Sequence, residues 1–190
     1  MHSDVKMAKK KGKEWYTMSS PEMFGRTELG KTLSEDSNLL LDRKISVSLM
    51  DLVNDFRKYY MKFSFKVVEV KGDTAMTEFV GSTCMRDYVS RMVGRWSTRV
   101  DTVQDLTTKD GIKIRVKGIL IIPRKVKSSI KSAVRDDVRN SIQSEVEKET
   151  LEEFVNSIIS DKIKRKVLRN AQRIYPVKGF EIRKTEVSSK

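Results

Sequence analysis

The stretch RVDTVQDLTTKDGIKIRVKGILII, residues 99–122, carries the clearest structural signal in this chain. Two runs of strand-forming residues flank the turn signal KDG, and such runs joined by a short turn that contains glycine form a β-hairpin. In the second run Lys113, Arg115 and Lys117 alternate with apolar residues, and Pro123 ends the run because proline cannot donate a ladder hydrogen bond. The pattern predicts an antiparallel hairpin with one buried face and one basic stripe.

Beyond the hairpin the apolar spacing changes from two residues to about four, which predicts that residues 128–175 are mainly helical. We expect three helices there. Ser128 or Ser129 is the predicted N-cap of the first helix and Asp161 that of the third, because their side-chain oxygens accept hydrogen bonds from free helical amides. The stretch VKGFEIRKTEV, residues 177–187, predicts a last short strand.

The part of the chain that leads into the hairpin also shows strand periodicity. Residues 45–123 are predicted to be mainly strands, with one amphipathic helix over residues 85–96 whose spacing assigns Trp96 to the core. Residues 19–42 are turn-rich and follow neither period, so we expect an irregular segment there. The order of strands, helix, strands, helices and strand is typical of an α+β fold with an antiparallel sheet.

The length of 190 residues suits one domain. Residues 1–14 are rich in lysine and poor in apolar side chains, which predicts a basic, flexible N-terminal arm. We expect residues 15–187 to form a single α+β domain and residues 188–190 to form a short tail.

The charge balance favours a polyanionic partner. Thirty-nine Lys and Arg against 26 Asp and Glu give a net charge of +13, and nucleic acid is the leading candidate for such a field. The longest apolar run, Ile119 to Ile122, is far shorter than the ~18 residues that a spanning helix needs, so we expect no membrane insertion. A chromatin protein or a membrane-surface protein remains an alternative reading of the charge.

Enzymatic chemistry finds little support. The chain has one cysteine and one histidine, which disfavours disulfides, the usual zinc and haem sites, and Ser-His or Cys-His catalysis, so no cofactor or metal is predicted. The stretch GRTELGKT, residues 25–32, fits the phosphate-loop template of nucleotidases. That template requires a strand before it and a helix after it, and neither neighbouring sequence predicts one. The nucleotidase is therefore kept only as the alternative function.

Recognition of folded RNA through its shape and phosphates fits the sequence better than base reading, because no sequence-reading motif is present. Trp15, beside Lys13, either stacks on an unpaired base or packs in the core. The predicted RNA-binding residues are Lys9, Lys10, Lys11, Lys13, Trp15, Arg86, Arg91, Arg95, Arg99, Lys113, Arg115, Lys117, Arg124, Lys125, Lys127, Arg183 and Lys184.

Four stretches carry a family resemblance: EWY followed by SPEMFG; VEVKGDTAMTEFVG; RDYVSRMVGRWSTRVDTVQDLTTKDGIKIRV; and RIYPVKGFEIRKTEV. In content and order they resemble the archaeal and eukaryotic small-subunit ribosomal protein family S3Ae, in its shorter archaeal form. The resemblance covers nearly the whole chain, from Trp15 to Val187.

The resemblance implies a non-enzymatic, cytoplasmic component of the small ribosomal subunit. It implies binding to ribosomal RNA on the platform near the mRNA exit, contact with neighbouring ribosomal proteins and, in some members, with mRNA and initiation factors. It also implies a partly barrel-like β core with helices packed around it, and a loop without nucleotide role at residues 25–32.

Overall fold

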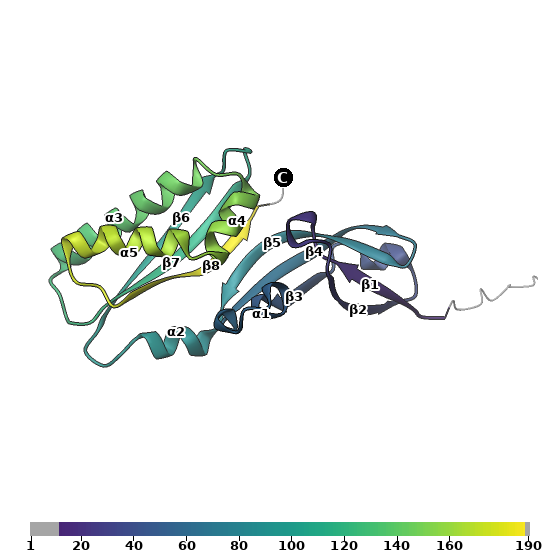
Figure 1. The fold of residues 1–190 in the computed structure, drawn as a ribbon, viewed down its shortest axis with the longest axis horizontal. Helices are drawn as coiled ribbons and strands as arrows, with labels where there is room; N and C mark the ends of the chain where they lie inside the picture. The colour runs from purple at the N-terminus through teal and green to yellow at the C-terminus, as the bar shows by residue number, and fades with distance from the viewer. Residues whose placement is uncertain (1–11, 189–190) are drawn as a thin grey trace, which may run out of the picture. The chain divides into compact units, whose positions relative to one another are not determined.

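The computed structural model describes residues 12–188 and confirms the α+β class (Figure 1). The strands are β1 (Glu14–Ser19), β2 (Glu28–Ser34), β3 (Lys44–Ser48), β4 (Met61–Lys71), β5 (Thr74–Cys84), β6 (Thr98–Thr107), β7 (Lys113–Ile122) and β8 (Gly179–Val187). The α-helices are α1 (Leu49–Val53), α2 (Arg86–Met92), α3 (Ser128–Val146), α4 (Leu151–Ile159) and α5 (Lys162–Ile174). Short 3-10 turns occur at η1 (Glu22–Phe24), η2 (Ser37–Leu40) and η3 (Phe56–Lys58).

The strands form one mostly antiparallel sheet in the order β2-β1-β5-β8-β7-β6, and β4 pairs with β3 and β5. The pair β1 and β5 is parallel. Within residues 12–188 the sheet does not close, because β2 and β6 each stand at an end of this order, so the expected partly barrel-like core is in fact an open sheet. Contacts divide the described residues into two compact units, 12–45 with 65–78 and 46–64 with 79–188. The single domain remains a prediction.

The first unit has its own small core. Tyr16, Met18, Leu40, Val67 and Ala75 are buried together in it. The segment 19–42, predicted to be irregular, in fact contains β2, which pairs antiparallel with β1. The sequence of β2 shows no alternation because it is an end strand whose side chains are mostly exposed or half-buried, so the ladder hydrogen bonds to β1 define it.

Two aromatic side chains near the start of β1 have opposite environments. Tyr16 is buried, whereas Trp15 lies on the other face of the strand with 65% of its surface exposed. The alternative that placed Trp15 in the core is therefore wrong, and base stacking by Trp15 remains a prediction.

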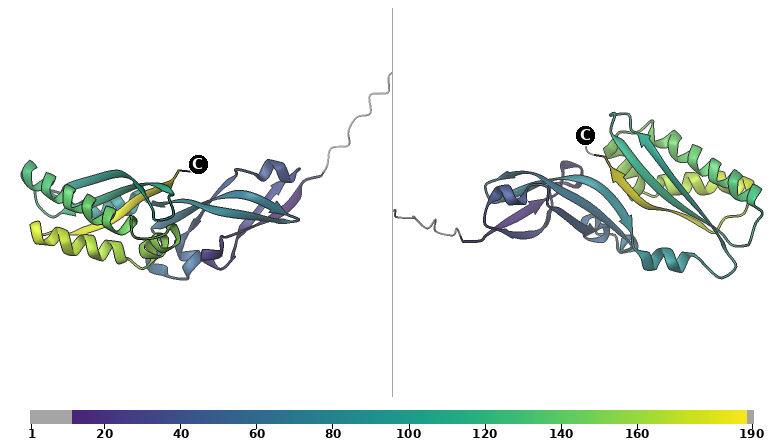
Figure 2. Two further views of the ribbon diagram at one scale, coloured as in Figure 1. Left: turned by 90° about the horizontal axis from the view of Figure 1, so that it is seen from above. Right: turned by 180° about the vertical axis from the view of Figure 1, so that it is seen from behind.

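In the second unit, β6, β7 and β8 form an antiparallel layer with α3 and α5 lying along one face (Figures 1 and 2). The predicted hairpin is confirmed, with pairs running from Thr98 opposite Ile122 to Thr107 opposite Lys113. The core lies between the layers and consists of side chains at alternate strand positions and at helical spacing. Its members include Val100, Ile114, Val116, Val134, Val138, Ile142, Ile163, Val167, Ala171 and Phe180.

Helix ends differ from the sequence expectations at three places. Lys127 occupies the N-cap of α3 without a side-chain cap hydrogen bond, so neither Ser128 nor Ser129 is the cap. Asp161 does precede α5, but its backbone is left-handed with φ 56° and its side chain accepts no cap bond. The helix expected over 85–96 ends at Met92, so helical spacing does not apply to Trp96, which is 62% exposed and not in the core.

Close contact between β5 and β8 generates a stability prediction. A Cβ atom placed on Gly81 would lie 2.1 Å from the backbone carbonyl oxygen of Thr185. Gly81→Ala therefore forces two strands apart, and we expect a loss of about 3 kcal/mol in the free energy of unfolding measured with urea. Gly94→Ala is the control, because the nearest atom is the mobile end of Lys178 at 3.8 Å. Equal unfolding midpoints for the two variants would contradict the predicted close packing.

Candidate nucleic-acid interface

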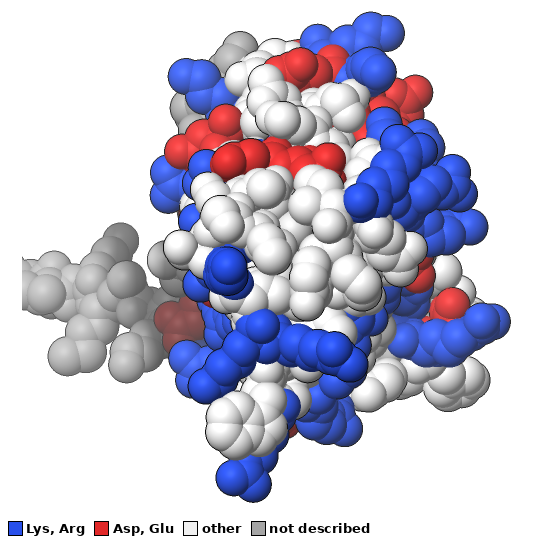
Figure 3. All heavy atoms as spheres, turned by 90° about the vertical axis from the view of Figure 1, so that its left-hand side faces the viewer, with Lys and Arg blue, Asp and Glu red and all other residues white. Residues whose placement is uncertain are grey.

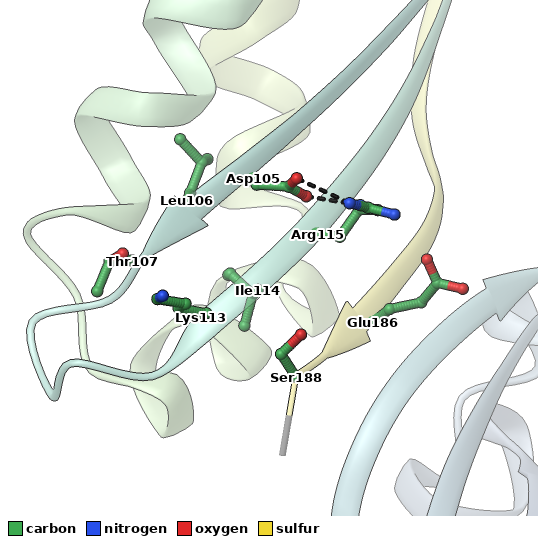
Figure 4. Close-up of a pocket in the computed structure, with 8 residues that line it drawn as sticks. All are labelled: Asp105, Leu106, Thr107, Lys113, Ile114, Arg115, Glu186 and Ser188. Atoms are coloured by element: carbon green, nitrogen blue, oxygen red, sulfur yellow. Dashed lines mark hydrogen bonds and ion pairs between the residues drawn. The ribbon is translucent and has the colours of Figure 1, made fainter. Parts of the chain in front are cut away.

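The basic stripe of β7 lies on the face of the sheet opposite α3 and α5. Ile114 and Val116 are buried, and Lys113, Arg115 and Lys117 point to the other face. Lys113 and Arg115, together with residues from β6 and from the end of β8, line a shallow cavity of about 630 Å³ (Figure 4). The alternation predicted from the sequence is therefore present in the structure.

Most of this stripe is neutralised by carboxylates. The guanidinium of Arg115 donates two hydrogen bonds to Asp105 on β6, from Nε to Oδ1 at 2.6 Å and from Nη2 to Oδ2 at 2.8 Å (Figure 4). These bonds lower the pKa of Asp105 and raise the pKa of Arg115. Asp105 stands directly opposite Arg115 in the hairpin register, so counting outward from the KDG turn would have found this pair.

Glu186 on β8 neutralises two further cations. Its carboxylate lies 2.8 Å from the Nζ of Lys117 and 2.6 Å from the Nζ of Lys184. The hydrogen bonds from these two lysines lower the pKa of Glu186 to about 2. Arg99 pairs in the same way with Asp101 on β6. Among residues 12–188, Lys113 is the one predicted cation of this face that forms no ion pair.

A second group of cations gathers where β6 begins, β7 ends and β8 begins. Thr98 pairs with Ile122, and the amide of Lys178 donates to the Ile121 carbonyl at 2.8 Å, so three chain segments meet at this end of the sheet. Residues 93–99, 123–135 and 170–180 contain no Asp or Glu. These segments hold nine Lys and Arg, of which Arg99 is paired with Asp101 and Arg135 lies further along α3. We call the other seven the basic end: Arg95, Arg124, Lys125, Lys127, Lys131, Arg173 and Lys178.

The basic end is accessible to a large partner. All of its cations are exposed except Lys131, which is half-buried. Figure 3, which faces the side of the molecule where this end lies, shows a broad gathering of Lys and Arg side chains. Asp137 lies on α3, two residues past the end of the acid-free segment 123–135. Burial raises the pKa of its carboxyl, and the charge of Arg173 lowers it.

Trp96 lies among these cations. The Nζ of Lys125 is 4.7 Å from the centre of its ring and the Cζ of Arg95 is 5.6 Å away, both within the range of cation–π contacts. Sequence reasoning found Arg95, Arg124, Lys125 and Lys127, but it assigned Trp96 to the core and left Lys178 out. Their proximity depends on tertiary pairing of distant segments, although the missing carboxylates were visible in the sequence.

The other predicted residues do not join either group. Arg86 and Arg91 are exposed on α2, and Arg91 donates to the Tyr59 hydroxyl at 3.4 Å. Arg183 lies at a register shift between β7 and β8, and its buried Nε has no partner among residues 12–188. Lys13 is exposed beside Trp15 in the first unit. Lys9, Lys10 and Lys11 lie outside the described residues.

The three lysines of α5 have structural roles. Lys162 contacts Glu149 at 2.6 Å, Lys164 contacts Glu181, and Lys166 contacts Glu145. All three carboxylates belong to buried residues, so these lysines satisfy charges inside the fold. The high lysine content of this helix is therefore a poor indicator of RNA contact.

Features expected of an enzyme are not brought together. The phosphate-loop stretch at 25–32 runs into β2, so Lys31 and Thr32 lie in a strand, not at the start of a helix. Burial, followed by the charge of Glu181, raises the pKa of the Cys84 thiol to about 12, which keeps it protonated and unreactive near pH 7. In the part of the chain that the structure describes, no three His, Cys, Asp or Glu residues gather as a metal site.

The Glu186 pairs generate a pH prediction. A carboxyl whose pKa is lowered on folding stabilises the fold above its unfolded pKa, near 4.5, and loses that effect as the pH falls towards about 2. We expect Glu186→Gln to cost about 1 kcal/mol or less at pH 7, because the pairs are partly exposed. The difference from wild type should shrink between about pH 4.5 and 2 in denaturant unfolding. Glu78→Gln, at an exposed position on β5, is the control, and a Glu186→Gln difference that grows at low pH would contradict this account.

Comparison of the sequence with known proteins identifies its family. The profile of the Ribosomal S3Ae family matches residues 3–190. Small ribosomal subunit protein eS1 of Methanothrix thermoacetophila is 38% identical over 182 residues, covering 96% of this chain and 86% of that protein. The protein of the same name from Methanothermobacter thermautotrophicus is 37% identical, covering 93% and 91%, and that from Sulfurisphaera tokodaii is 35% identical, covering 92% and 91%.

The structure and the comparisons agree with the resemblance seen in the sequence. No helix within residues 12–188 has the length and apolar character needed to span a bilayer. The chain has an α+β fold and a group of cations whose segments contain no carboxylate. Its sequence matches the family profile over almost its entire length. The chain belongs to the ribosomal S3Ae family.

Proposed function

We propose that this chain is a structural constituent of the small ribosomal subunit that binds folded ribosomal RNA, chiefly through its basic end. The observation that carries the proposal is the convergence of seven cations from three chain segments that contain no carboxylate. Like charges held together repel one another, and RNA phosphates relieve that repulsion while releasing condensed counterions. The family and the names of the relatives support the ribosomal setting.

The mode of binding follows from the chemistry of these side chains. Lysine and arginine contacts to phosphates fix position and orientation without reading bases. The face of the sheet around Arg115 contributes less to the net field, because its cations already have carboxylate partners. Recognition therefore depends on how phosphates are arranged on the RNA surface, which is how folded RNA is commonly recognised.

The wider setting is part of the same proposal. We assign the chain to the platform of the subunit near the mRNA exit, in the cytoplasm, with neighbouring ribosomal proteins as further partners and with access to mRNA and initiation factors. The family resemblance supports this assignment. The chain acts there without a catalytic group, and the alternative nucleotidase lacks its essential loop because β2 occupies Glu28–Ser34.

Salt dependence tests the proposed mechanism. If each of the seven cations meets one phosphate, the slope of log K against log salt is about −6, taking ~0.9 per contact for B-form duplex as a stand-in for folded RNA. The measurement is a titration of the full chain with small-subunit ribosomal RNA at several salt concentrations. A flat response would exclude phosphate neutralisation, and equal affinity for DNA duplex or anionic vesicles would favour the chromatin or membrane-surface alternative.

Charge removal at the basic end tests its location. We expect the triple variant Arg124→Ala, Lys125→Ala, Lys127→Ala to reduce the magnitude of the salt slope by about 3, because each lost phosphate contact removes nearly one unit. The matched control is Lys62→Ala, Lys109→Ala, Lys148→Ala, which removes the same charge from exposed positions outside the basic end and outside the predicted RNA-binding residues. Equal slopes for the two triple variants would place the RNA contact elsewhere.

A further inference from the structure

Trp96 is held in an unusual position by its turn. Its φ of 67° lies in the left-handed region, which costs about 1 kcal/mol or more for a bulky side chain. The Ser97 hydroxyl donates to the Gly94 carbonyl at 2.6 Å, and the Thr98 hydroxyl donates to the Arg124 carbonyl at 2.9 Å. These bonds tie the turn both to itself and to the segment that follows β7.

Folding alone does not explain a tryptophan at this site. A glycine adopts φ near 67° without strain, yet the glycine of this turn, Gly94, is not among the residues with positive φ. The strained position instead carries the largest apolar side chain available, and 62% of its surface is exposed. Burial therefore does not offset the strain, and a tryptophan exposed to this extent presents a broad aromatic face to a partner.

The surroundings of the ring define the chemistry of that partner. Lys125 and Arg95 lie within cation–π distance of the ring, and the Lys125 ammonium sits on a flexible stem that can move from the ring to a nearby phosphate. None of the three segments around the ring contains a carboxylate, so no acid of these segments repels an anionic group next to a stacked ring. A flat aromatic group flanked by phosphates fits both the exposed ring and the positive charge around it.

We propose that Trp96 is a stacking site for a single unpaired nucleobase of RNA, with Arg95 and Lys125 holding the phosphates on either side of it. Base–aromatic stacking tolerates any base, because every base has a π-face, so the site selects an unstacked nucleotide and not a sequence. This inference rests on the proposed RNA-binding function and adds a fixed point of contact to it.

The test uses the full chain and two short RNA duplexes, identical except that one carries a single-nucleotide bulge. Trp15 and Trp96 are the two tryptophans of the chain, so a Trp15→Phe background leaves Trp96 as the one fluorescent indole. We expect saturable quenching of Trp96 fluorescence by the bulged duplex and little by the perfect duplex. Trp96→Ala should weaken binding of the bulged duplex by roughly tenfold and leave the perfect duplex unchanged, in line with measured base–aromatic stacking.

Controls separate stacking from folding and from charge. Trp96→Phe keeps an aromatic ring and should retain part of the preference for the bulged duplex, while thermal unfolding shows whether either variant disturbs the fold. If Trp96→Ala weakens both duplexes equally, or weakens neither while the salt slope persists, the stacking site is wrong and the proposed function stands. Failure of the wild-type chain to bind any RNA at low salt would overturn the proposed function and the stacking site together.

Discussion

The packing of α3 and α5 on one face of the β6–β7–β8 layer is the constraint on which the second unit depends. Val116 from the sheet, Val138 from α3 and Val167 from α5 are fully buried at this contact. A charge without water or a partner is costly, and the buried carboxylates of Glu145 and Glu181 accordingly have lysine partners on α5. Most cations of the unit therefore lie on the open face of the sheet, on the outer surfaces of the helices and in the loops at the ends, whereas the buried Lys58 is paired with Asp161.

A cation on the open face of the sheet has carboxylate neighbours, whereas a cation at the basic end does not. On the open face, antiparallel register sets Asp105 directly opposite Arg115. Glu186 pairs diagonally with Lys117 on β7 and with Lys184 two residues before it on β8. Exposed pairs of this kind stabilise a fold by only about 0–1 kcal/mol, so their larger effect is to cancel the local field. The loops of the basic end have no such register and no carboxylates, so their field remains. The distribution of acids, more than that of lysines, therefore decides where the positive field of this unit remains.

The sequence predicted the hairpin of β6 and β7 and the C-terminal helices, because burial on one side imposes a period that a single chain segment displays by itself. It failed at β2, an end strand defined by its partner, and at Trp96, which lies past the point where α2 ends. It named four cations of the basic end, but their meeting with Lys178 depends on how β8 returns beside β7. Contacts between distant segments are the part that local pattern cannot supply.

Phosphate contacts and a stacked base provide different kinds of information to a protein that binds folded RNA. Phosphate neutralisation gives affinity over a broad range of orientations, because the charge field falls off slowly and the lysine stems are flexible. A ring fixed by its turn permits only a narrow set of approaches, since a base must slide parallel to it at van der Waals distance. Trp96 and the basic end share one end of the β6–β7–β8 layer, so one stacking contact there would convert general attraction into a defined orientation of this layer on its RNA.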